Sequence, residues 1–152
     1  MAQSLLRAAH SDLVKQFSVF AENKVGRLND VVLLLAAHDV HIMALSLVDT
    51  TDSTVIRLVV DYPEQATKLF KDHGFAHNTV DVVAIEIDHE QQFRTVTCAL
   101  VQAEINIHYI YPFLMRPRGK TGLVLRLEDH ELASDVLRQN QITVLSQSDI
   151  AR

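Results

Sequence analysis

The stretch VFAENKVGRLNDVVLLLAAHDV, residues 19–40, decides the fold of this chain. Val19 and Phe20 end an apolar strand, a polar turn with a glycine follows, and apolar residues then recur at the three-and-four spacing of one helical face. The residues expected on that buried face are Leu28, Val31, Val32, Leu35 and Ala36. A strand that enters a helix through a glycine turn leaves the first helical N–H groups unpaired, which favours an anion such as a carboxylate.

Two residues of the turn matter for this interpretation. Asn23 can cap nearby N–H groups, and Gly26 lets a ligand approach the backbone closely. The same residues also fit a turn that caps only itself, because an isolated glycine turn is a weak signal. The stretch alone therefore leaves both a ligand site and a purely structural turn open.

Length and composition limit the possible functions. The chain has 152 residues, 48% of them hydrophobic, which suits one ordinary domain or two very small ones with a packed core. The net charge of −5 argues against nucleic acid or an anionic membrane as a partner, because phosphate groups are bound by clustered Lys and Arg. The only cysteine, Cys98, excludes an intrachain disulfide and favours a reducing cytoplasm, and its neighbours predict an inert thiol in a buried helix.

The first half of the chain predicts a βαββαβ unit. Strands are expected at residues 14–21, 41–49 and 54–61, and helices at residues 27–38 and 63–71. Pro63 opens the second helix and Gly74 ends it. The apolar stretch that follows either forms one strand shared with the next unit or two abutting strands, and we favour two, at 75–80 and 82–87.

The same pattern then starts again, which indicates an internal repeat. Residues of the first half match residues 65 positions later up to the hairpin and 67 positions later after it, as in Leu28 with Phe93 and Leu58 with Leu125. The second unit has expected helices at 92–103 and 130–140 and strands at 106–114, 122–128 and 143–148. The predicted units span residues 14–80 and 81–150, and residues 1–13 form a tail or short helix.

The order and duplication of these elements resemble tandem ACT domains, which sense small molecules on enzymes of amino-acid metabolism. The match is similar to short, free-standing proteins of two ACT units. The segments that carry the resemblance are ENKVGRL at 22–28, ALSLVDT at 44–50, IRLVV at 56–60 and NIHYIYPF at 106–113. The resemblance implies an α+β fold of two ferredoxin-like units packed side by side, through their second strands, into one extended antiparallel sheet with helices on one face.

The resemblance also implies where a ligand binds. In this family the first strand-to-helix loop of one unit faces the second strand of its neighbour, and the ligand lies between the two. Carried over, the ligand-binding residues are Asn23, Lys24, Val25, Gly26, Arg27 and Leu28 from the loop and His108, Tyr109, Ile110 and Tyr111 from the strand. The second unit departs from this pattern, since Gln91 replaces Gly26 and its loop has no glycine.

Other residue patterns are weaker. The eight histidines include His38 with His41 and His73 with His77, but neither pair has the spacing of a metal site, so exposed or helix-capping histidines are expected. Arg116, Arg118 and Lys120 form a basic hairpin tip that fits a solvated turn better than a phosphate site. We therefore expect no metal, no cofactor and no catalytic residues.

The sequence and the resemblance together favour a cytoplasmic, non-enzymatic regulatory protein that binds a small molecule, expected to be an amino acid. We expect a homodimer formed through the helix-free sheet face or a sheet edge. The alternative is a regulatory subunit that acts mainly by binding a biosynthetic enzyme, with ligand binding weak or lost. An enzyme on a ferredoxin-like scaffold is disfavoured, because no nucleophile or acid–base set converges.

Overall fold

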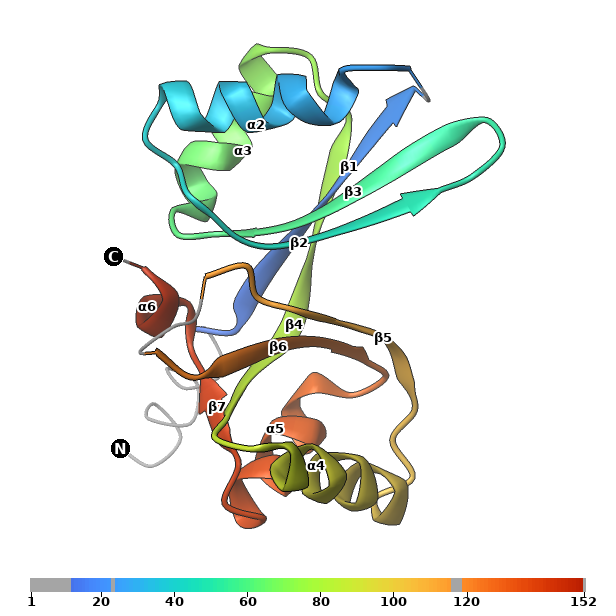
Figure 1. Cartoon of the computed structure of the whole chain (residues 1–152), viewed down its shortest axis with the longest axis vertical. Helices are drawn as coiled ribbons and strands as arrows, with labels where there is room; N and C mark the ends of the chain where they lie inside the picture. Colours follow the sequence, from blue (N-terminus) through green and yellow to red (C-terminus); the bar gives the residue numbers. More distant parts are fainter. Residues whose placement is uncertain (1–11, 23, 116–118, 152) are drawn as a thin grey trace.

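The computed structural model describes residues 12–22, 24–115 and 119–151 and shows two α/β units (Figure 1). Asn23, Arg116, Arg118 and nearly all of residues 1–13, for which a tail or short helix is expected, lie outside the described residues. The first unit contains β1 (Val14–Glu22), α2 (Arg27–Ala37), β2 (Ile42–Asp49), β3 (Ser53–Val60), α3 (Pro63–Asp72) and the first half of β4 (His77–Ile87). The predicted order of these elements is confirmed.

The second unit repeats this order from the second half of β4. It continues with α4 (Glu90–Gln102), β5 (Ile107–Pro112), β6 (Thr121–Leu127), α5 (His130–Gln139), β7 (Thr143–Leu145) and α6 (Gln147–Ile150). The prediction of a last strand at 143–148 is wrong at its end. Ser146 and Asp149 form a capping box that starts the short helix α6 instead.

Strand β4 corrects the prediction of two abutting strands, because residues 77–87 form one continuous strand. Its first half pairs with β1 as far as Val82, and its second half pairs with β6 from Val83 onward. Strand β7 pairs with the same second half. The residue between the two predicted strands is Asp81, with neither glycine nor proline beside it, so the chain stays extended and one strand serves both units.

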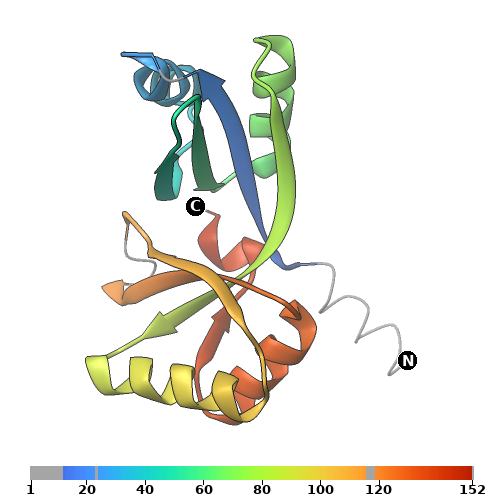
Figure 2. The same cartoon turned by 90° about the vertical axis from the view of Figure 1, so that its right-hand side faces the viewer.

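All strands form one antiparallel sheet in the order β2-β3-β1-β4-β6-β5, with β7 also paired to β4. Side chains alternate along β4: Val83 and Ile85 pack under α4 and α5, whereas Val82 and Ala84 face the other way. The long helices therefore cover one face of the sheet, as predicted. The sheet bends at β4, so that the helix pairs lie at opposite ends of the molecule (Figures 1 and 2).

This bend closes the helix-free face on itself and corrects part of the predicted dimer surface. A core of apolar side chains from both units fills the inner part of that face: Val14, Met43, Ala44, Val59, Val82, Ala84, Tyr111, Phe113, Val124, Leu145 and Ile150. Much of the face that we expected to drive dimer formation is thus buried within one chain.

The second strands do not join the two units in the predicted way. β2 and β5 are the outermost strands in the order of the sheet, and its continuity runs through β4. They meet through the bridge between Ala44 and Phe113, beside which the Leu114 N–H donates to the Met43 carbonyl over 2.8 Å. The prediction that the units pack through these strands therefore holds only for this local contact.

The internal repeat is confirmed at the ends of the helices. Asp39 and Glu104, 65 positions apart, both take positive φ angles, of 59° and 56°. In each unit the next N–H then donates to a helix carbonyl five residues earlier, from Val40 to Leu35 and from Ile105 to Leu100. Gly74, at φ 72°, ends α3 as predicted, because the left-handed backbone there favours glycine.

Two details of the helix predictions are wrong. Val31 and Leu35 of α2 are buried as expected, but Ala36 is exposed and Leu34 packs against the core of the first unit. Cys98 lies in α4 as predicted, yet its side chain is exposed, because Val96 and Leu100 occupy the inward face. In the part of the chain that the structure describes, no helix is long and apolar enough to cross a lipid bilayer.

Candidate functional site

The loop between β1 and α2 has the conformation that a glycine requires. Gly26 is the N-cap of α2 and has a φ of 93°, in the left-handed region that other residues rarely adopt. Its carbonyl accepts from the Asp30 N–H over 2.9 Å, which begins the helix. A Cβ placed on Gly26 would meet no atom within 4 Å. The backbone at this helix start is therefore open to an approaching ligand.

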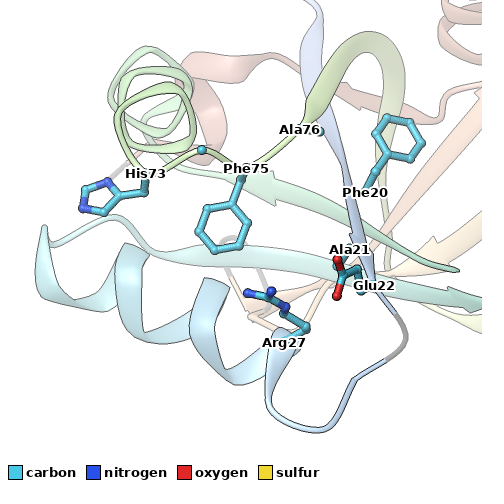
Figure 3. A pocket seen from close by; sticks show the side chains of 8 residues that line it. Phe20, Ala21, Glu22, Arg27, His73, Phe75 and Ala76 are labelled. Carbon is cyan, nitrogen blue, oxygen red and sulfur yellow. The ribbon is translucent and has the colours of Figure 1, made fainter.

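A cavity of about 210 Å³ lies beside this helix start. Its walls are the end of β1, the first residue of α2 and the turn between α3 and β4: Phe20, Ala21, Glu22, Arg27, His73, Gly74, Phe75 and Ala76. Arg27 and Phe75 point toward one another across it, and Glu22 lies next to Arg27 (Figure 3). The cavity belongs entirely to the first unit.

The cavity carries one acidic and one basic side chain. Glu22 pairs with Lys24 over 2.6 Å, and the hydrogen bond and positive charge of Lys24 hold the pKa of the Glu22 carboxyl below its ordinary value. Arg27 pairs with Asp30 over 3.6 Å and keeps 41% of its side chain exposed. The Glu22 carboxyl is therefore charged at neutral pH, and both side chains remain reachable from solvent.

In the equivalent loop of the second unit, a side chain forms a hydrogen bond with the backbone of the loop itself. Gln92 occupies the position that matches Arg27, and its side-chain carbonyl accepts from the Asp88 N–H. Ile142, which matches Phe75, is buried. The loop of the second unit is thus held by one side-chain hydrogen bond ahead of the helix, while His89, the N-cap of α4, makes no side-chain cap hydrogen bond.

The predicted loop residues have different roles in the structure. Arg27 lines the cavity, and Gly26 shapes the helix start. Lys24 binds Glu22, Val25 is fully exposed, and Leu28 packs against the core of the first unit. Sequence reasoning missed Glu22 and the 73–76 turn. Glu22 could have been found from the sequence, because it directly precedes the loop. The 73–76 turn could not, because only the tertiary fold brings it to the cavity.

The predicted β5 residues lie away from this cavity within one chain (Figures 1 and 2). His108 and Ile110 are exposed. The Tyr111 hydroxyl donates to the Gln16 side-chain carbonyl over 2.5 Å, and the Gln16 amide donates to the Tyr109 hydroxyl over 2.6 Å. Among the described residues, no hydrogen bond or ion pair links β5 to the β1–α2 loop.

Two of the described histidines, His38 and His73, bind carbonyl groups at helix ends, as predicted. Nδ1 of His38 lies 3.0 Å from the Leu34 carbonyl oxygen, and Nδ1 of His73 lies 3.0 Å from that of Leu69. The contact of His41 with a buried carboxylate was not predicted. Its Nδ1 lies 2.8 Å from the Asp61 carboxylate, which is almost completely buried. Within residues 12–22, 24–115 and 119–151, no group of three or more His, Cys, Asp or Glu side chains could hold a metal ion.

Comparison with solved structures finds the same fold elsewhere. Protein BT0572 from Bacteroides thetaiotaomicron is 30% identical, with 92% of this chain and 96% of that chain covered at a TM-score of 0.83. The ligand-free regulatory subunit of aspartate kinase from Thermus thermophilus is 13% identical, with 86% and 91% covered at a TM-score of 0.61. Its counterpart from Thermus flavus is 15% identical, with 86% and 94% covered at 0.56. These last two show similarity of fold.

A comparison with curated proteins found no match. The family model of the ACT domain pair matches residues 12–152, a range that includes every described residue. Its two units correspond to the two βαββαβ units that share β4. The chain therefore belongs to the ACT domain pair family.

Proposed function

We propose that this chain is a non-enzymatic regulatory protein that binds an amino acid in the cavity between β1 and α2. The observation that carries the proposal is the presence of one acidic and one basic side chain, Glu22 and Arg27, in the lining of one small cavity at a helix start. An amino acid has a carboxylate and an ammonium group on neighbouring atoms. The guanidinium of Arg27 and the first N–H groups of α2 suit the carboxylate, and the Glu22 carboxylate suits the ammonium group.

The surroundings of the two charges agree with this ligand class. The cavity of about 210 Å³ is smaller than most sites for drug-sized ligands, which have about 300–1,000 Å³. Phe75 and Ala21 supply apolar surface for the rest of the ligand. The fold similarity to two regulatory subunits of aspartate kinase supports a regulatory role over an enzymatic one.

The β5 residues enter this proposal through a second copy. β5 is an outermost strand, and within one chain it lies away from the loop formed by residues 24–28. In a homodimer, β5 of one copy can approach the loop of the other, with His108 and Ile110 the exposed members of the predicted set. The predicted site between a loop and the second strand of a neighbouring unit would then form between two chains, with the loop from one copy and β5 from the other.

The alternative function is a subunit that acts mainly by binding a biosynthetic enzyme. One observation favours it: in the second loop the Gln92 side chain binds the Asp88 N–H, and the helix start there has His89 in place of a glycine at the N-cap. Under this alternative, the protein would co-purify with a larger enzyme and would show no response to amino acids.

A thermal-shift screen with the twenty amino acids tests the proposal. A ligand at a hundred times its dissociation constant stabilises the native state by about 2.7 kcal/mol, which raises the melting temperature by roughly 5–10 °C in a chain of this size. We expect Arg27→Gln to abolish the shift. Arg94→Gln, on the exposed face of α4, is the matched control and should retain it. No shift with any amino acid at millimolar concentration would contradict the proposal.

A further inference from the structure

A row of polar side chains crosses the helix-free face of the first unit. The strand register places Ser46, Arg57, Ser18 and Asn78 directly opposite one another on β2, β3, β1 and β4. Residues opposite one another in a sheet point to the same side and lie about 5 Å apart. The next row along these strands contains Val48, Val55 and Phe20, and the Phe20 side chain is 45% exposed.

Arg57 is held in one orientation at the boundary between the units. Its guanidinium carbon lies 3.6 Å from the ring centroid of Tyr109 on β5. Stacking on an aromatic ring fixes the plane of a guanidinium and leaves its N–H groups free at the edge. Tyr109 is itself fixed, because its hydroxyl accepts from the buried Gln16 side chain.

Three side chains of this row, those of Arg57, Ser18 and Ser46, lack an acceptor within residues 12–22, 24–115 and 119–151. Among the described residues, no carboxylate forms an ion pair with Arg57, and neither Ser18 nor Ser46 makes a side-chain hydrogen bond. Ser18 is only 9% exposed as a whole residue. An oriented arginine without an acid, flanked by two free hydroxyl groups, matches the planar geometry of a carboxylate.

We propose that this row is a second binding site, which takes a small carboxylate with an apolar chain and no ammonium group. The Arg57 fork would hold the carboxylate, and the two serine hydroxyl groups would complete its hydrogen bonds. The exposed Phe20 and the half-buried Val48 and Val55 would contact the apolar chain. The site differs from the Glu22–Arg27 cavity because the row contains no acid to bind an ammonium group. In Figure 3 the Phe20 side chain lies on the other side of β1 from Arg27.

Isovalerate and valine are the probes that separate the two sites, since valine differs only by its ammonium group. We expect isovalerate at millimolar concentration to shift the amide NMR signals of Ser18, Ser46 and Arg57. We expect valine to shift them much less. Acetate, which has the same carboxylate without the chain, should bind more weakly than isovalerate. This outcome does not depend on whether any amino acid occupies the first cavity.

The variants test the role of Arg57. Arg57→Gln should weaken isovalerate binding at least about tenfold, which corresponds to about 1.4 kcal/mol, and Arg57→Lys should weaken it less because the charge remains. Ser46→Ala, a half-buried position without a hydrogen bond to lose, tests the site in a variant expected to fold. Arg94→Gln should have no effect. Unchanged binding in Arg57→Gln and Ser46→Ala, or equal binding of acetate and isovalerate, would overturn the proposal.

Discussion

The hydroxyl of Tyr111 donates to the side-chain carbonyl of Gln16 over 2.5 Å and joins the second unit to the first. Gln16 has no exposed surface and Tyr111 has 6%, so this hydrogen bond is buried between the two halves of the bent sheet. Burial raises the pKa of the Tyr111 hydroxyl well above its ordinary value of 10.0, so the hydroxyl stays protonated and remains a donor at neutral pH.

Removing this donor should loosen the contact between the units. In Tyr111→Phe the Gln16 carbonyl keeps its buried position without this partner, which costs about 1–3 kcal/mol of unfolding free energy. Tyr109→Phe is the comparison variant, because it removes the acceptor of the Gln16 amide and keeps the bond from the Tyr111 hydroxyl to the Gln16 carbonyl. Urea unfolding of the three proteins measures the difference. A Tyr111→Phe variant as stable as the wild type would show that the bond contributes nothing.

His130 predicts a dependence of stability on pH. Its Nε2 lies 2.6 Å from Nη1 of Arg126, where it accepts a hydrogen bond in its neutral form. Burial and the charge of Arg126 lower the pKa of His130 below its ordinary value of 6.5, against opposing effects of Asp81 and Asp129. The unfolded chain therefore binds a proton at higher pH than the native protein does.

The stabilising contribution of neutral His130 is consequently complete above pH 6.5 and is lost as the pH falls from there toward the lowered native pKa. His130→Gln should remove this part of the pH dependence. Unfolding free energies of both proteins between about pH 7.5 and about pH 5 provide the measurement. Parallel pH profiles of the wild type and the variant would refute the prediction.

Gly122 leaves room for Phe113 across the β5–β6 hairpin. A Cβ on Gly122 would lie 2.5 Å from Cδ2 of Phe113, closer than real contacts allow. Gly122→Ala should therefore cost about 1–3 kcal/mol through overpacking. In the Phe113→Ala background, Gly122→Ala should cost less unfolding free energy than it does in the wild type, because the ring that it would clash with is gone. If the losses of unfolding free energy of the two single variants simply add in the double variant, the clash with Phe113 is not the cause of the Gly122→Ala loss.

Gly26 tests the helix start directly. Gly26→Val places a branched side chain at a φ of 93°, which a valine cannot adopt without strain, so the loop must change its path. We expect amino-acid binding to disappear while the fold is largely retained, since the added atoms meet no neighbour within 4 Å of the Cβ. Binding by thermal shift and fold by circular dichroism are the two measurements. Retained binding would move the site away from this loop.

Much of the fold could be predicted because its signals are local. The helical spacing around Val31 and Leu35, Pro63 at a helix start and Gly74 at a helix end each depend on residues close in sequence. The offsets of 65 and 67 then placed the second unit without further information. Ser146 was a missed local signal, since its capping box with Asp149 ends the predicted last strand.

The arrangement of the units could not be predicted in the same way. The bend of the sheet at β4 depends on which strands pair with each half of it, and the burial of Tyr111 against Gln16 depends on that bend. Only one side of the cavity could be predicted, for the same reason. Arg27 follows from the loop, whereas Phe75 reaches the cavity only after α3 packs on the sheet.

The most direct test of the proposed ligand site is an NMR titration of the labelled protein with the amino acid that raises its melting temperature most. The account predicts that the largest amide shifts fall in residues 21–28 and 73–76, around the cavity that Glu22 and Arg27 line. Shifts confined to β5 and the Arg57 row, or no shift at millimolar concentration, would contradict it.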